Sequence, residues 1–373
     1  MPAPTIGKIA GYVEELAPLA WAESWDNVGL QVGDPARTAG RILVALELTG
    51  GVVEEAVAGG AELIVVHHPA IFKPWKAIRF DTPGGKRVER LVRAGIGLYA
   101  AHTNLDQAAG GTNDTLAATA GLTTHEVLLI AGEEKYVKLV VYVPAGHEDA
   151  VRNALAKAGA GHIGNYSHCT FQTEGTGTFR PLAGSNPFLG QQGQLEYARE
   201  LRLETILPES GVRRALQAML CAHPYEEVAY DLYSLANPGR GRGHGRIGRL
   251  ESPVTLQELT LRMKKALGIP HLRAVGDPGR TVQTVAVGAG SGGMLIPHAA
   301  RRGADVLITG DVDYHDAQDA ADAGLAVIDV GHYNSEVIVV PPLAAYLRQR
   351  LIQDALDGHV MEAQAGRDPF LFL

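Results

Sequence analysis

Histidine and carboxylate side chains follow two short apolar runs in the first third of this 373-residue chain. The run ELIVV is followed at once by His67 and His68, and the run IGLYAA is followed by His102 and, four residues later, by Asp106. Imidazole nitrogens and carboxylate oxygens are donors that proteins offer to zinc, manganese, iron or cobalt. The residue types at these two places therefore predict a metal site without cysteine ligands.

The last third of the chain carries a second set of such side chains. The run LAVIDV is followed by His332 and Glu336, and the run DVLIT is followed by Asp311, Asp313 and His315. If residues 332–336 begin a helix, His332 and Glu336 lie on one face and can point at the same ion. Both sets together offer more ligands than one open catalytic zinc needs, and they suit two ions ~3.5–4 Å apart that share a bridge.

Each of these groups also has a purely structural interpretation. A His–His pair is common in surface loops, a histidine and a glutamate four residues apart can form a helix-surface ion pair, and Asp106 can cap a following helix. His102 is expected to orient a neighbouring ligand rather than to bind metal itself. Asp311, Asp313 and His315 either contact the ligands or face the substrate, and His315 or Asp313 is the candidate for proton transfer. We favour metal binding because remote polar groups recur at equivalent strand ends.

The elements that must position these side chains alternate between strands and helices. The first third predicts strands at 41–49, 62–66 and 96–101 and helices at 51–61 and 86–95, and the last third repeats this plan with strands at 284–290, 305–309 and 325–330 and helices at 293–304 and 315–324. Near-continuous apolar strands separated by amphipathic helices are typical of mostly parallel sheets covered on both faces. The sequence therefore predicts an α/β fold of two related halves, whose strands deliver polar residues to one rim.

The middle of the chain follows a different plan. Strands at 135–145 and 226–235, with helices at 148–159 and 210–223, indicate β-α-β units and predict a ferredoxin-like α+β insertion. The glycine- and proline-rich segment 175–194 is expected to be a long ordered loop, and the glycine- and arginine-rich segment 237–250 a return linker. The predicted domains are a discontinuous metal-binding domain, 1–130 and 240–373, and an inserted domain, 131–239.

Composition and charge exclude some classes of protein. The net charge is −8 without a basic stripe, which does not favour a nucleic-acid binder. No run reaches the ~18 apolar residues of a membrane span, and the N-terminus lacks the pattern of a signal peptide. The two cysteines, Cys169 and Cys221, have no metal or disulfide spacing, and Cys169 has no visible base partner. These features predict a cytoplasmic protein without a catalytic thiol.

The segment that contains Trp25, Asp26 and Asn27 has two interpretations. It is either a local turn held by the aspartate and asparagine side chains or a wall of the metal pocket. This segment is also part of a set of motifs that extends over nearly the whole chain: AESWDNVGLQVG (22–33), VVHHPAIF (65–72), AHTNLDQAAGGTND (101–114), GRIG (245–248), DVLITGDVDYHDAQDA (305–320) and DVGHYNSE (329–336).

Taken together, these motifs resemble the NIF-three-like family, whose bacterial members are labelled GTP cyclohydrolase I type-2 homologues. The middle resembles the family's long form through GHIGNYSHCTFQTEGTGTFRP (161–181), GSNPFLG (184–190) and AHPYEEVAYDLY (222–233). The resemblance implies a toroidal homohexamer and an insertion similar to the PII- or CutA-like ferredoxin folds. It also implies a dinuclear site of two divalent ions per subunit, with ligands at His67, His68, Asp106, His332 and Glu336.

Two functions are compatible with such a site. The first is a metal-dependent hydrolase, cyclohydrolase-like, that acts on a nucleotide-like or phosphorylated small molecule through metal-activated water. The alternative is a non-catalytic regulatory or scaffold hexamer that binds a protein or nucleic-acid partner. Hydrolysis is favoured here because five ligands with open positions are more than a scaffold requires.

Overall fold

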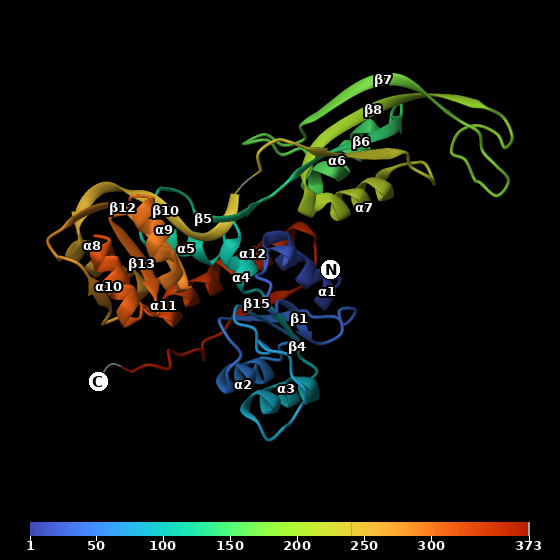
Figure 1. Ribbon diagram of the computed structural model, residues 1–373. Coiled ribbons are helices and arrows are strands. Elements are labelled where there is room, and N and C mark those ends of the chain that lie inside the picture. The colour runs from blue at the N-terminus through green and yellow to red at the C-terminus, as the bar shows by residue number, and fades with distance from the viewer. Residues whose placement is uncertain (240, 372–373) are drawn as a thin grey trace. The chain divides into compact units, whose positions relative to one another are not determined.

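The computed structural model describes residues 1–239 and 241–371 and divides into two compact units (Figure 1). The larger unit consists of Met1–Ala131 with Arg242–Leu373, and the smaller unit is Gly132–Gly241. Arg240, within the predicted linker 237–250, lies outside the described residues. The fold is mixed α/β, as the sequence predicts.

The first sheet of the larger unit has five strands in the order β1-β4-β3-β2-β15. Strands β2, β3, β4 and β15 are parallel, and β1 pairs antiparallel with β4. The bounds of these strands are β1 Gly29–Val32, β2 Arg41–Ala45, β3 Leu63–Val66, β4 Gly97–Ala100 and β15 His359–Glu362. The strands predicted within 41–49, 62–66 and 96–101 are thus confirmed.

Alternation along the buried strands sends side chains to two different helix layers. Ile42 and Val44 of β2 belong to a core with helices α1 (Ile6–Leu16) and α12 (Val340–Gln353). Leu43 and Ala45 face the opposite way, toward α2 (Gly50–Ala58) and α3 (Pro83–Ala94). Burial on both faces explains why these strands are apolar at every inner position.

The second sheet has six strands in the order β11-β14-β13-β12-β10-β5. Strands β12, β13 and β14 are parallel, while β11 and β10 pair antiparallel with β14 and β12. The bounds are β5 Thr124–Glu133, β10 Gly241–Thr255, β11 Arg273–Val275, β12 Thr281–Ser291, β13 Val306–Gly310 and β14 Ala326–Asp329. The prediction of a linker at 237–250 is wrong for residues 241–250, which form most of β10.

Helices cover both faces of this sheet as well. Helices α5 (Thr112–Thr119) and α8 (Leu256–Leu267) pack on one face, and α9 (Ile296–Arg301) and α10 (Tyr314–Asp322) pack on the other. The two sheets share a plan: three parallel strands in chain order, β2-β3-β4 or β12-β13-β14, and then an antiparallel edge strand, β1 or β11. Corresponding strand ends therefore lie at corresponding places in the two halves.

The smaller unit is a four-stranded antiparallel sheet with two helices. Its elements run β6 (Tyr136–Pro144), α6 (Glu148–Lys157), β7 (Thr170–Phe179), β8 (Glu196–Pro208), α7 (Val212–Ala222) and β9 (Tyr230–Leu235), and the strand order is β7-β8-β6-β9. Alternate residues of β6, from Val137 to Val143, pack against apolar residues of both helices. The predicted loop 175–194 is wrong for residues 175–179, which belong to β7.

The remaining helices are short. Helix α4 (Thr103–Gln107) follows β4 and helix α11 (His332–Glu336) follows β14, and single 3-10 turns occupy η1 (Leu19–Trp21), η2 (Glu209–Gly211), η3 (Gly293–Leu295) and η4 (Val337–Val339). Among the described residues, none of the helices combines the length and the apolar character that a membrane crossing would require.

Candidate metal centre

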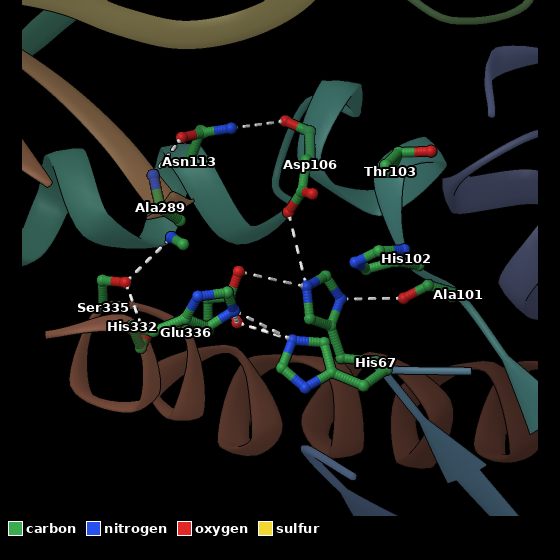
Figure 2. Close-up of polar contacts among 12 residues, drawn as sticks. His67, Ala101, His102, Thr103, Asp106, Asn113, Ala289, His332, Ser335 and Glu336 are labelled. Atoms are coloured by element: carbon green, nitrogen blue, oxygen red, sulfur yellow. Dashed lines mark hydrogen bonds and ion pairs between the residues drawn. The ribbon is translucent and has the colours of Figure 1, made fainter. Parts of the chain in front are cut away.

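The five predicted ligands come from three strand ends and meet in one cluster. His67 and His68 follow β3, Asp106 lies on α4 after β4, and His332 and Glu336 are the first and last residues of α11 after β14. Figure 2 shows Asp106, His67, His332 and Glu336 pointing toward one another from their separate elements. The predicted helix at 332–336 is confirmed, and it puts its histidine and glutamate on one face.

Three donor atoms form a compact triangle at one side of the cluster. His68 Nε2 lies 2.8 Å from Glu336 Oε2, His332 Nε2 lies 3.1 Å from the same oxygen, and the two nitrogens are 3.4 Å apart. Donors bound to one tetrahedral ion at about 2.1 Å are separated by roughly 3.4 Å. The triangle thus has nearly the dimensions of three ligands around one divalent ion.

A second group of donors lies on the other side of Glu336. His67 Nε2 lies 3.7 Å from Glu336 Oε1 and 3.6 Å from Asp106 Oδ1. The two oxygens of Glu336 therefore face different histidines, Oε2 toward His68 and Oε1 toward His67. A carboxylate in this position can bridge two ions.

Two of these donors are buried without a hydrogen-bond partner. His67 is 1% exposed, and its Nδ1 donates a hydrogen bond to the Ala101 carbonyl at 2.8 Å, which leaves the lone pair of Nε2 facing the cluster. Among the described residues, neither His67 Nε2 nor Asp106 Oδ1 has a hydrogen-bond partner, and the two atoms lie 3.6 Å apart. Burying such atoms unpaired costs about 1–3 kcal/mol each. A cation between them would satisfy both, so the donor set fits a metal ion.

Hydrogen bonds outside the cluster fix the orientation of its histidines. His332 Nδ1 donates to Asp311 Oδ2 at 2.7 Å, which directs Nε2 at the triangle. Asp311 has a φ of 52°, a left-handed conformation that aspartate adopts more readily than most residues. Asp311 thus contacts His332, a predicted ligand, and it also lines the cavity beside His68 and His332, so the structure is compatible with both roles expected for it.

Asp26 holds His102 in a similar way. His102 Nδ1 lies 2.9 Å from Asp26 Oδ1, and the backbone and hydroxyl of Thr103 donate to Asp26 Oδ2 at 3.1 and 2.6 Å. Donor atoms of His102, His67 and His68 lie within 4.8 Å of one another. His102 is thus placed either to bind an ion or to orient the others, and the segment around Asp26 is a wall of the site.

The buried side chain of Glu336, which is 3% exposed, occupies space that a side chain on Gly290 would fill. Gly290 has a φ of 68°, and a methyl group on it would overlap Glu336 Oε1. The Gly290 N–H donates to Ser335 Oγ at 2.9 Å, and this hydroxyl donates to the His332 carbonyl at 2.7 Å (Figure 2). Strand β12 thereby anchors the helix that carries two of the predicted ligands, His332 and Glu336.

Asn113 joins the two halves above the cluster. Its side-chain nitrogen donates to the Asp106 carbonyl at 2.9 Å, and its side-chain oxygen accepts from the Ala289 N–H at 2.9 Å (Figure 2).

The structural alternative for Asp106, a cap for the following helix, is not what is observed, because the N-cap of α5 is Gly111.

Opposite charges set the protonation of the buried groups. Burial alone would lower the pKa of His67, but Asp106 and Glu336 outweigh it and raise the pKa to about 9. The contact with Glu336 likewise raises the pKa of His332 to about 9. Burial would raise the pKa of Glu336, but contacts with His332, His67 and His68 hold it well below its ordinary value. The carboxylates therefore draw positive charge into the site, which either protons or metal cations can supply.

Asp313 and His315, the candidates for proton transfer, are placed differently. Asp313 is the N-cap of α10 and accepts from the Asp316 N–H at 2.8 Å, and the ring of His315 lies beside that of Tyr314. A cavity of about 560 Å³ opens next to His68 and His332, and neither candidate is among the residues that line it. The structure does not bring these two residues to the donor cluster.

The cavity includes residues that sequence reasoning did not find. Arg273 on β11 lies in its wall and pairs with Asp329, and Tyr333 and Phe370 also line it. On the other side of the cluster, Trp25 and Phe72 are 59% and 41% exposed, and their rings lie 6.3 and 6.2 Å from that of His102. Trp25 belongs to the segment that the sequence offers as a possible wall of the pocket, whereas no spacing pattern marks Arg273, Tyr333 or Phe370, which come from separate segments.

Known proteins match this chain over nearly its whole length. The family model Duf34/NIF3 (NGG1p interacting factor 3) matches residues 4–369. Relatives from Halalkalibacterium halodurans and Bacillus subtilis, both named GTP cyclohydrolase 1 type 2 homolog, are 46% and 42% identical, each over 96% of this chain and 96% of the relative. A Bacillus cereus crystal structure, described as a protein related to NIF3, is 43% identical, with a TM-score of 0.85 over 100% of both chains. The chain belongs to the Duf34/NIF3 family.

Proposed function

We propose that this protein binds two divalent metal ions and uses them to hydrolyse a nucleotide-like or phosphorylated small molecule. One ion is held by His68, His332 and Glu336, and the other by His67, Asp106 and the second oxygen of Glu336. The observation that carries the proposal is that two buried atoms without a hydrogen-bond partner, His67 Nε2 and Asp106 Oδ1, lie 3.6 Å apart.

The chain's own residues support a hydrolytic role for this site. Bound divalent ions would supply a water of lowered pKa and neutralise negative charge on the substrate. Asp311 holds His332 in the orientation that exposes Nε2, and Arg273 places a guanidinium in the wall of the adjacent cavity. The exposed ring of Trp25 offers an apolar face on which a base could stack, and the ring of Phe72 meets it edge-on at 65°. These features favour a substrate that combines an aromatic ring with anionic groups.

The names of the relatives direct the choice of substrates to test. Two relatives carry the name GTP cyclohydrolase 1 type 2 homolog, so GTP and other purine nucleotides head a panel that also includes sugar phosphates. Proton transfer by His315 or Asp313 would require a substrate or a conformational change that reaches α10. The same panel on His315→Ala therefore tests that assignment.

The deciding experiment combines metal analysis with turnover. Protein purified without chelator is expected to contain about two divalent ions per chain, and His67→Ala is expected to lose at least one. His315→Ala is the matched control, because it removes an imidazole from outside the donor cluster and should retain both ions. Turnover by metal-free protein, or full metal content in His67→Ala, would contradict the proposal.

The smaller unit and the assembly are the subject of two related proposals. The order β-α-β-β-α-β and the strand order β7-β8-β6-β9 support a ferredoxin-like fold for the smaller unit. The exposed apolar side chains of Ile78 and Phe80, in the loop after β3, support association into the homohexamer that the resemblance implies. Sedimentation of the intact chain tests the assembly.

A homohexamer that binds a protein or nucleic acid without turnover is the second candidate function.

A further inference from the structure

The smaller unit contains a cavity of its own, apart from the metal cluster. It has a volume of about 520 Å³, and all of its lining residues lie between Tyr142 and Ala229. Three of its aromatic lining residues form a cluster: the ring centroid of Tyr225 lies 6.0 Å from that of Phe179 and 6.1 Å from that of Phe188. Cavities of this size and aromatic character are typical of small-molecule sites.

A buried carboxylate is built into this aromatic wall. Glu200 on β8 is 8% exposed, and its Oε1 accepts a hydrogen bond of 3.0 Å from the Tyr225 hydroxyl. A methyl group on Gly177, in the neighbouring strand β7, would overlap the Glu200 carboxylate, so glycine at this position makes room for it. Among the described residues, no lysine or arginine forms an ion pair with Glu200. A buried carboxylate without a cationic partner is costly unless a ligand supplies the charge.

The charged side chains that line the cavity are mostly acidic. Glu226 and Glu227 also line it, and Arg180 is the one basic residue among the lining side chains. The neighbouring His223 does not add a positive charge, because its Nδ1 accepts from the Tyr225 N–H at 3.1 Å while its Nε2 donates to the Tyr142 carbonyl at 3.0 Å. That pattern requires the neutral imidazole. Burial also lowers the pKa of His223.

We propose that this cavity binds a small organic cation, an ammonium group carried on an aromatic or alkyl body. The cationic group would pair with the free oxygen of Glu200, and the body would lie against Phe179, Phe188 and Tyr225. Aromatic faces attract cations, and a carboxylate inside an apolar wall strengthens that attraction because water screens it little. An anionic ligand would meet three carboxylates and only one guanidinium, that of Arg180, among the lining side chains.

Three probes of similar shape and different charge test the proposal on the intact chain. Tryptamine carries an ammonium group on an indole, 3-ethylindole is neutral, and indole-3-propionate is anionic. Titration calorimetry is expected to rank their affinities in that order, with tryptamine at least about tenfold tighter than the neutral probe. This ranking needs no variant, so a folding defect cannot obscure it. Equal affinity for all three, or no binding of any at millimolar concentration, would overturn the proposal.

A matched pair of variants locates the charge that selects the ligand. Glu200→Gln is expected to lower the affinity for tryptamine to that for 3-ethylindole. The affinity for 3-ethylindole itself should not change. Glu174→Gln is the control, because Glu174 is an exposed carboxylate of β7 that pairs with Arg199. Phe188→Ala, at the rim, is expected to weaken tryptamine and 3-ethylindole alike. An unchanged charge preference in Glu200→Gln would assign the selectivity elsewhere and contradict the proposal.

Discussion

The carboxylate of Glu336 lies between His68 and His67, with one oxygen toward each. Its Oε2 is 2.8 Å from His68 Nε2, and its Oε1 is 3.7 Å from His67 Nε2. The glutamate comes from the last third of the chain and the histidines from the first, so this one side chain joins the two halves of the unit. If two ions bind, Glu336 is the ligand that both have in common.

Glu336→Gln is therefore expected to reduce the binding of both ions. An amide lacks the negative charge that lets a carboxylate bridge two cations, whereas His67→Ala removes a ligand from one side only. Elemental analysis of both variants, purified side by side, should find less metal in Glu336→Gln than in His67→Ala. Glu258→Gln, an exposed glutamate in the capping box of α8, is the control and should match the unmodified chain. Equal losses in the two site variants would argue against a shared bridge.

Gly290→Ala is expected to lower both stability and metal content. The added methyl group meets Glu336 Oε1, and the left-handed backbone adds a penalty of about 1–2 kcal/mol. Gly303→Ala is a close control, because Gly303 has a φ of 72° and no atom within 4 Å of the added methyl group. Thermal unfolding should show a loss in Gly290→Ala that exceeds the loss in Gly303→Ala by about 1–3 kcal/mol. Only the first variant should lose metal.

Asp311→Asn is expected to weaken metal binding about 10–100-fold without removing a ligand. The carboxylate accepts the Nδ1 proton of His332 and so sets the tautomer that exposes Nε2. Competition with a chelator measures the change in affinity. Asp313→Asn is the matched control two residues away, since asparagine caps helices about as well as aspartate does. Equal metal affinities in the two variants would show that Asp311 does not contribute to metal binding through His332.

Trp25→Ala is expected to weaken the binding of ligands that contain a base. Loss of one stacking surface costs about 1–3 kcal/mol per base, or roughly 5–150-fold in affinity. GMP and ribose 5-phosphate make a suitable pair of probes, because they differ only in the base. Calorimetry should show a loss for GMP and little change for ribose 5-phosphate. A similar loss for both, or for neither, would exclude Trp25 as a stacking surface.

Acid is expected to destabilise the larger unit in part through Asp354. Partial burial raises the pKa of this carboxyl, but contacts with Lys8 at 2.6 Å and the Tyr12 hydroxyl at 2.8 Å outweigh it and leave the pKa below its ordinary value. A lowered folded-state pKa adds stability above the unfolded value, about 3.9, and this stability is lost as the pH falls toward the folded value.

Urea unfolding of chelated protein at several pH values between about 5 and 3 measures this contribution. Asp354→Asn should be less stable than the unmodified chain at pH 5, and the difference should shrink as the pH falls. Asp322→Asn, at an exposed position of α10, is the control and should keep the unmodified pH dependence. A difference that stays constant across the range would contradict the expected titration.

The sequence predicts the strands and the residues that follow them because both signals are local. Runs such as LIVV can only be buried, and polar residues directly after such runs must appear at a strand end, as His67 and His68 do. The pairing of Asp26 with His102 is different, since 76 positions separate the two residues and nothing nearby marks the contact. Similarly, no local pattern shows that Asp311, with its left-handed backbone, contacts His332, whereas Asp313 caps α10.

The errors also have physical causes. Glycine-rich segments have weak strand propensity, which is why the sequence predicts a linker for residues 241–250 and a loop for residues 175–179. Their strand conformation comes from partners that are distant in sequence: β10 pairs with β12, and β7 pairs with β8. Backbone pairing with a neighbouring strand overrides local preference, and a single sequence does not reveal that neighbour.

The place of β15 has a consequence for how the chain is made. This strand, His359–Glu362, pairs with β2 at the edge of the first sheet, although nearly all of the chain is synthesised between them. Helix α12, just before it, also packs on the core of that sheet. While a ribosome is still extending the protein, the amino-terminal sheet lacks an edge strand and part of one apolar cover. This sheet can therefore be completed only after residues 359–362 have left the ribosome, and until then its open edge is exposed to premature association.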